Sequence, residues 1–109
     1  MESEKTDLYY IRNVGCDDET CGLAAISRRR FHYLKNIIQN LNKNSTYGCM
    51  PIIEMYKIDD SFIRPATEED KDYNILYTIF GNYVLSKPLH YCDPETKDFK
   101  LAEGVERVC

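Results

Sequence analysis

The sequence has no long apolar run and no tryptophan, and it holds only two histidines among its 109 residues. A membrane-spanning helix needs about 20 consecutive, mostly apolar residues, and no stretch of this chain approaches that length. The first seven residues are polar and charged, so they do not resemble a secretion signal. We therefore expect a cytoplasmic protein that does not engage a membrane.

Cationic side chains are in deficit. The chain has 14 lysines and arginines against 18 aspartates and glutamates, which gives a formal charge of −4. General affinity for nucleic acid depends on a positive surface, so nucleic acid is not expected as the main partner. Hydrophobic residues make up 43% of the chain, enough for a core. The length suits one domain over residues 1–109, with the charged residues 1–6 expected to be flexible.

The sequence also lacks the paired, closely spaced cysteines and histidines of most structural zinc sites. Four of its five cysteines could form a tetrahedral site only from scattered positions: Cys16, Cys21, Cys49 and Cys92. Without a secretion signal, reduced thiols are the expected state, and we expect no metal and no cofactor. The acidic run Asp17-Asp18-Glu19 lacks the EF-hand pattern and is better explained as a solvated turn.

The clearest structural signal is a helix over residues 27–44. Apolar residues recur there at alternating spacings of three and four, which places them on one helical face. They are Phe31, Leu34, Ile38 and Leu41, with Ile37 widening the stripe. Ser27 is a good N-cap, because its hydroxyl can accept from a free amide of the first turn. Such a face must cover a sheet.

The flanking segments supply that sheet. Residues 8–14 and 20–26 read as a hairpin around the turn at 15–19, and residues 52–58 as a strand near the sheet centre. Beyond them, helical spacing predicts a second helix over about 68–80, ended by Gly81, followed by a strand at 83–86. A turn is expected at 93–96, and residues 99–101 are expected to form a short edge strand or an arm. The predicted class is α+β, with a small, mostly antiparallel sheet and the main helix on one face.

Two groups of residues indicate alternative functions, one catalytic and one in nucleic-acid binding. Cys49 lies in a loop shaped by glycine and proline, and it would become a nucleophile only beside His32 or His90. No local motif supports such a pair, so a thiol- or metal-dependent enzyme is the alternative and not the expectation. Residues Arg28–Arg30 open the helix and could contact phosphate, although neighbouring carboxylates could offset them. A nucleic-acid binder is therefore the second alternative.

We expect instead a non-enzymatic, protein-binding module. In a strand-turn-strand-helix-loop-strand unit, the loops at 15–20 and 45–50 should lie at the same end of the sheet, and binding residues concentrate on such loops. The predicted site has an acidic rim and an aromatic centre, suited to a groove on a basic protein. Its residues are Asp17, Asp18, Glu19, Tyr47 and Met50.

Two stretches carry a resemblance. VGCDDET at residues 14–20 and NSTYGCMPI at 44–52 resemble segments of small proteins encoded by phages and mobile elements. In those proteins a G-C-D-D-x-T turn opens a hairpin and an S-T-Y-G-C-M-P loop leads into the next strand. The resemblance covers about residues 8–58 and brings no activity with it. It implies a small protein made during infection that binds and inhibits a host machine, as anti-CRISPR proteins do.

Overall fold

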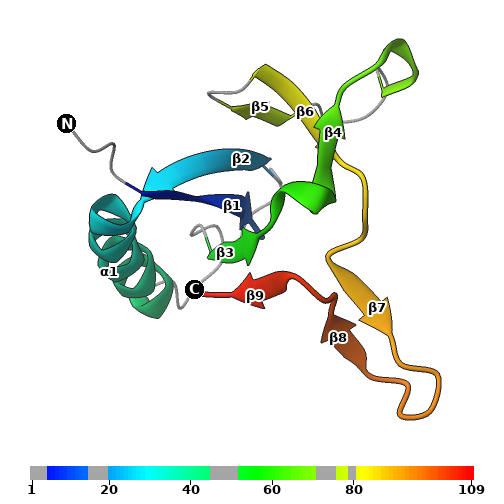
Figure 1. Cartoon of the computed structure of the whole chain (residues 1–109). Coiled ribbons are helices and arrows are strands. Elements are labelled where there is room, and N and C mark those ends of the chain that lie inside the picture. The colour runs from blue at the N-terminus through cyan, green and yellow to red at the C-terminus, as the bar shows by residue number, and fades with distance from the viewer. Residues whose placement is uncertain (1–4, 15–19, 45–51, 71–75, 79–80) are drawn as a thin grey trace.

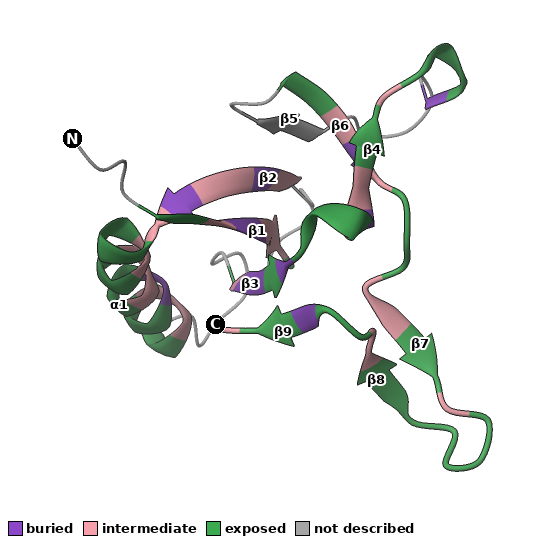
Figure 2. Ribbon diagram, in the orientation of Figure 1, coloured by how far each residue is buried: buried purple, intermediate pink, exposed green. Residues whose placement is uncertain are grey.

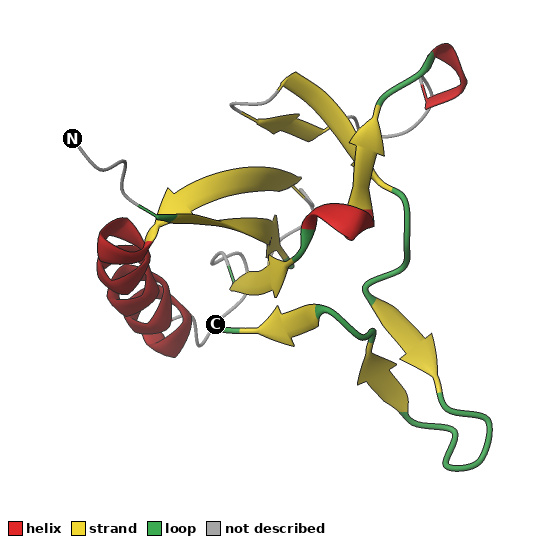
Figure 3. Cartoon of the chain, viewed as in Figure 1, coloured by secondary structure: helices red, strands yellow, loops and turns green. Residues whose placement is uncertain are grey.

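The computed structural model describes residues 5–14, 20–44, 52–70, 76–78 and 81–109. Their strands form three antiparallel sheets with one long helix, α1, on a face of the largest sheet (Figures 1 and 3). The predicted α+β class, with its main helix packed on a mostly antiparallel sheet, is confirmed.

The four-stranded sheet is built around β1 (Thr6–Asn13), which pairs along its length with β2 (Thr20–Ser27) and β3 (Ile53–Ile58). The short strand β9 (Val105–Arg107) pairs with the other edge of β3, giving the order β2-β1-β3-β9. The predicted hairpin and the interior position of the third strand are both confirmed. Branched and aromatic residues dominate β1 and β3, as strands buried on both faces require.

The helix α1 spans Arg28–Asn44. The amide of Arg30 donates to the Ser27 hydroxyl at 3.2 Å, so the expected N-cap is present. Ile38 is buried on the sheet, and the Phe31 ring stacks on Tyr9 with centroids 5.0 Å apart. Ile37 differs from expectation: it is 45% exposed, because the helix meets the sheet along one side and the wider stripe turns toward solvent.

The predicted second helix is wrong. Glu68–Asp70 forms only a single 3-10 turn (η2), Leu76–Thr78 is a strand (β5), and Gly81–Leu85 is its antiparallel partner β6. Gly81 has a positive φ of 106° and opens β6 where it was expected to end a helix. The many branched and aromatic residues here favour strands, and they outweigh the helical spacing. The expected strand at 83–86 is part of β6.

The remaining elements extend away from the main sheet. The 3-10 turn η1 (Asp60–Phe62) leads into β4 (Ile63–Pro65), which joins β6 and β5 in a three-stranded sheet. Strands β7 (His90–Cys92) and β8 (Phe99–Leu101) form a separate hairpin on the side opposite α1 (Figure 1). The predicted turn at 93–96 and strand at 99–101 are confirmed.

Figure 2 shows the buried stretches of β1, β2, β3 and β9. Alternation along the strands divides the core into two clusters, one on each face of the main sheet. The helix-side cluster is Tyr9, Ile26, Ile38 and Met55. The cluster on the other face is Leu8, Leu23, Tyr56, Ile58, Phe62 and Val105. Both clusters draw on β1 and β3, so these two strands are central to the packing on both faces of the main sheet.

Candidate functional site

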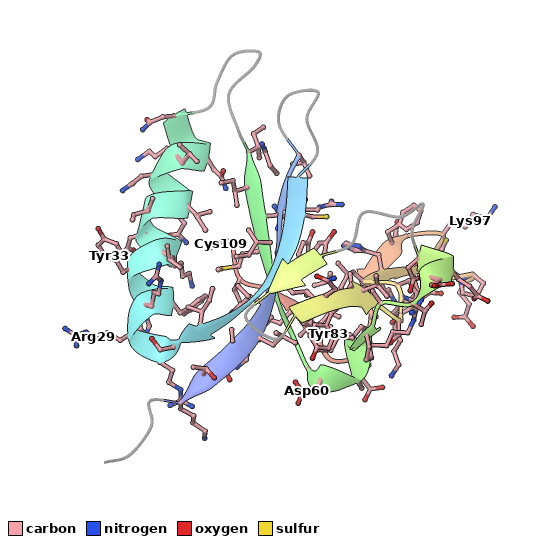
Figure 4. The ribbon with its side chains drawn as sticks, turned by 90° about the horizontal axis from the view of Figure 1, so that it is seen from above. Arg29, Tyr33, Asp60, Tyr83, Lys97 and Cys109 are labelled. Carbon is pink, nitrogen blue, oxygen red and sulfur yellow. The ribbon has the colours of Figure 1, made fainter. Side chains whose placement is uncertain are left out.

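Four element ends meet at one end of the main sheet. In the strand register, Asn13 stands opposite both Thr20 and Ile53. The Val14 amide donates to the Ile52 carbonyl at 2.7 Å, and the Ile52 amide donates to Asn13 Oδ1 at 3.1 Å. The flanks of segments 15–19 and 45–51 therefore lie together, as Figure 4 shows for β1, β2, β3 and α1.

The last turn of α1 is fixed to the same place. The Asn42 side chain donates to the Ile53 carbonyl at 2.7 Å and accepts from the Ile53 amide at 2.8 Å. One amide side chain thus satisfies both backbone groups of a strand residue, in the way a neighbouring strand would. The end of the sheet is consequently a well-supported platform.

A shallow groove of about 270 Å³ opens beside this platform, at the edge of β2. Ile11, Ala24 and Ile53 contribute apolar walls. The Arg12 guanidinium is bound to Glu54 on the opposite face of the sheet. Gly22 leaves the groove open, since a Cβ built on it would meet no atom within 4 Å. Val14 and Ile52 are 38% and 40% exposed at the same end.

Behind the groove, a carboxylate is held between two arginines. Glu54 is 8% exposed; its Oε1 lies 2.7 Å from Arg12 Nη2, and its Oε2 lies 3.2 Å from Arg107 Nη2. The Tyr56 hydroxyl donates to Oε2 at 2.9 Å. Burial alone would raise the pKa of Glu54, but the hydrogen bonds from Arg12 and Tyr56 and the arginine charges outweigh it and lower the pKa. A carboxylate so fully bonded braces β1, β3 and β9 and is not available as a base.

The two histidines proposed as partners of Cys49 lie on opposite faces of the main sheet. His32 is exposed on α1, next to the Phe31 ring. His90 packs edge-on against Tyr56 on the helix-free face, with centroids 5.6 Å apart. At most one histidine can therefore serve Cys49, which itself lies outside the described residues.

The thiols that the structure describes are dispersed. Cys21 packs with the helix-free cluster, Cys109 with the helix-side cluster, and Cys92 is exposed on β7. Of the four cysteines considered for zinc, only Cys21 and Cys92 fall in the described part. Within that part, no group of three or more histidine, cysteine or acidic residues is arranged to hold a metal ion.

The predicted partner-binding residues themselves (Asp17, Asp18, Glu19, Tyr47 and Met50) lie outside the described residues. The groove beside Gly22, at the described flanks of these segments, was not predicted. Its signal in the sequence is weak: a glycine and two alanines in a strand of otherwise good propensity.

The cationic N-terminal end of α1 is exposed to solvent. All three side chains of Arg28–Arg30 are exposed, and no carboxylate lies in the first helical turn. In Figure 4, Arg29 and Tyr33 point away from the sheet. The sequence carries a broader sign of this surface than the three arginines, because residues 27–44 include no aspartate or glutamate.

No helix among the described residues combines the length and apolar character needed to cross a bilayer. No protein-family model matches the chain, and neither does any curated protein or solved structure.

Proposed function

We propose that this chain is a non-enzymatic binding protein that engages a protein partner with the end of the sheet where β1 and β3 meet α1. The observation that carries the proposal is the apolar groove lined by Ile11, Ala24 and Ile53 beside exposed Val14 and Ile52. Apolar side chains gathered at an accessible end of a sheet are typical of interaction surfaces.

The open shape of the groove favours a protein over a small molecule. Small-molecule sites usually bury most of the ligand's surface, whereas this groove of about 270 Å³ is shallow and open along the β2 edge at Gly22. Such a volume accommodates one or two side chains of a partner, which is the usual form of an anchor in a protein interface.

The supporting structure is rigid where binding would need it. Asn13, Asn42 and the backbone of Ile52 and Ile53 are joined by hydrogen bonds of 2.7–3.1 Å. Glu54 ties the strands together behind the groove. Binding residues on such a platform lose little conformational freedom when a partner docks.

The acidic run Asp17-Asp18-Glu19 lies in the sequence between β1 and β2. Three neighbouring carboxylates favour a partner with a basic surface. Taken with the resemblance to phage and mobile-element proteins, we propose that the partner is a host machine and that binding inhibits it, as in counter-defence of the anti-CRISPR kind. The partner is expected in the host cytoplasm.

Charge reversal tests the proposal. The full chain serves as bait in host lysate, and the captured protein is identified and purified. Asp17→Lys with Asp18→Lys should then weaken its binding, mainly through a lower association rate that depends on salt. The matched control is Glu68→Lys with Glu69→Lys, an equal charge change on the exposed turn η2. Equal affinity of the two double variants would contradict the proposal.

A further inference from the structure

The outer face of α1 is a second surface, separate from the groove at the sheet end. The helix carries five of the chain's 14 cationic side chains and none of its 18 carboxylates. Arg28, Arg29, Arg30 and Lys43 are exposed, whereas Lys35 is half-buried with its Nζ 5.7 Å from the centroid of the Phe31 ring. A chain that is negative overall thus keeps one element strongly positive, and this uneven distribution steers polyanions to one side.

The other polar residues of this face are His32 and several amides. Asn36, Gln39 and Asn40 are all exposed, and each offers both a donor and acceptors. Tyr33 is 69% exposed and points away from the sheet (Figure 4). Arginine reads guanine edges, and asparagine and glutamine read adenine edges, in the major groove of DNA.

From this face we infer that α1 binds duplex DNA by lying in its major groove. The fit is geometric as well as chemical. Seventeen residues make a helix about 25 Å long and, with side chains, about 10–12 Å wide, and the B-form major groove is about 12 Å wide. The deep, narrow major groove of double-stranded RNA does not admit a helix.

An acidic protein is the competing occupant, and the face is poorly suited to it. Protein interfaces need a compact apolar or aromatic centre. On α1 the large hydrophobic side chains that are strongly exposed are Tyr33, 69% exposed, and Ile37, 45% exposed, one helical turn apart. These two side chains lie among cations and amides and make a small patch for such a centre. In DNA an isolated apolar side chain can contact a thymine methyl group.

The test uses a fluorescent B-form duplex of about two helical turns and measures its anisotropy with the full chain. We expect binding at about 50 mM salt that weakens steeply by about 200 mM. Double-stranded RNA of the same sequence should bind less well. No binding of the DNA at the lower salt, or tighter binding of the RNA, would overturn the inference.

Variants localise the contact. Arg29→Glu with Arg30→Glu places carboxylates in the first turn, where the helix dipole and the Ser27 cap favour them, so α1 should stay folded. Affinity should fall about tenfold or more and the salt slope by about two. Lys87→Glu with Lys97→Glu changes the charge equally outside α1 and should retain more affinity. An equal loss in both double variants would reduce the binding to net charge and overturn the inference.

Two further measurements separate DNA from other polyanions. Asn36→Ala with Asn40→Ala removes no charge, and it should reduce affinity several-fold while leaving the salt slope unchanged. Poly-glutamate should compete poorly against the labelled duplex. Unchanged affinity in the amide variant, or competition by poly-glutamate as strong as by unlabelled duplex, would show an unspecific acidic-partner surface instead. None of these variants alters the groove beside Gly22, so failure here leaves the proposed protein-binding function standing.

Discussion

Arg12 Nη2 lies 2.7 Å from Glu54 Oε1, and the two residues stand directly opposite each other in the register of β1 and β3. Arg12 Nε also donates to the same oxygen at 2.9 Å. Arg107, on the far side of β3, holds the other oxygen. One buried carboxylate thus joins three strands beneath the proposed binding end. Ion pairs as well as apolar contacts therefore stabilise this part of the sheet.

Removing that carboxylate should change how stability depends on pH. The pKa of Glu54 is lowered in the folded protein, so this carboxylate stays ionised at pH values somewhat below the ordinary glutamate pKa of 4.5. The unfolded chain binds that proton at higher pH, so the stabilisation is fully present above about pH 4.5 and is lost as pH falls through the folded pKa.

Glu54→Gln should therefore cost about 1–3 kcal/mol at pH 7, and the cost should shrink at acid pH. Urea unfolding of both proteins between neutral and acid pH measures this. Asp59, Asp70 and Asp93 also have lowered pKa values, but they are present in both proteins, so their effect cancels. A cost that is constant across the range would show that the charge of Glu54 contributes nothing.

Substitution by alanine should lower the free energy of unfolding at one glycine and leave it nearly unchanged at another. At Gly104 the backbone has a φ of 91°, and a Cβ would lie 2.6 Å from Asp59 Oδ2 and 2.9 Å from the Phe62 ring. Gly104→Ala should lose about 1–3 kcal/mol of unfolding free energy through strain and displacement of Asp59. Gly22→Ala meets open space and should change stability by less than about 0.5 kcal/mol. Similar losses in thermal or urea unfolding would contradict the backbone geometry of the β8–β9 connection.

Alanine substitutions on the apolar face of α1 should destabilise the protein to different degrees, according to how deeply each side chain is buried. Ile38 is 7% exposed in the helix-side cluster, and Ile38→Ala should cost about 2–5 kcal/mol. Leu34 is only half-buried, so Leu34→Ala should lower the free energy of unfolding by less than Ile38→Ala does. Ile37→Ala, at the exposed margin, should remain near the roughly 0.5 kcal/mol of a surface change. A loss at Ile37 equal to that at Ile38 would mean that α1 is rotated on the sheet.

The first half of the fold could be predicted because its patterns are local. The stripe from Phe31 to Leu41 and the capping serine define α1, and the branched residues of β1 and β3 define strands around it. Beyond Ile58 the spacing of Leu76, Tyr83 and Val84 suits a helix, yet a glycine with positive φ and β-prone neighbours make a hairpin there. Spacing alone cannot separate these two outcomes in short apolar segments.

Only the location of the candidate site could be predicted from the sequence. Strand order and connection lengths indicate that the flanks of 15–19 and 45–51 meet, and they do. The Glu54 ionic cluster and the groove at Gly22 depend on register between strands far apart in sequence, and no local pattern reports register. The amide-rich face of α1 was present in the sequence, as a helix without carboxylates, but its exposure depends on how the helix packs.

The most direct test of protein binding at the sheet end compares Gly22→Trp with Gly22→Ala. Tryptophan should fill the groove between Ile11, Ala24 and Ile53, while alanine should leave it open. The dissociation constant for the purified partner should rise by about tenfold or more, equivalent to about 1.4 kcal/mol, in the tryptophan variant alone. Unfolding midpoints confirm that both variants fold. Equal affinity of the folded tryptophan and alanine variants would contradict the account.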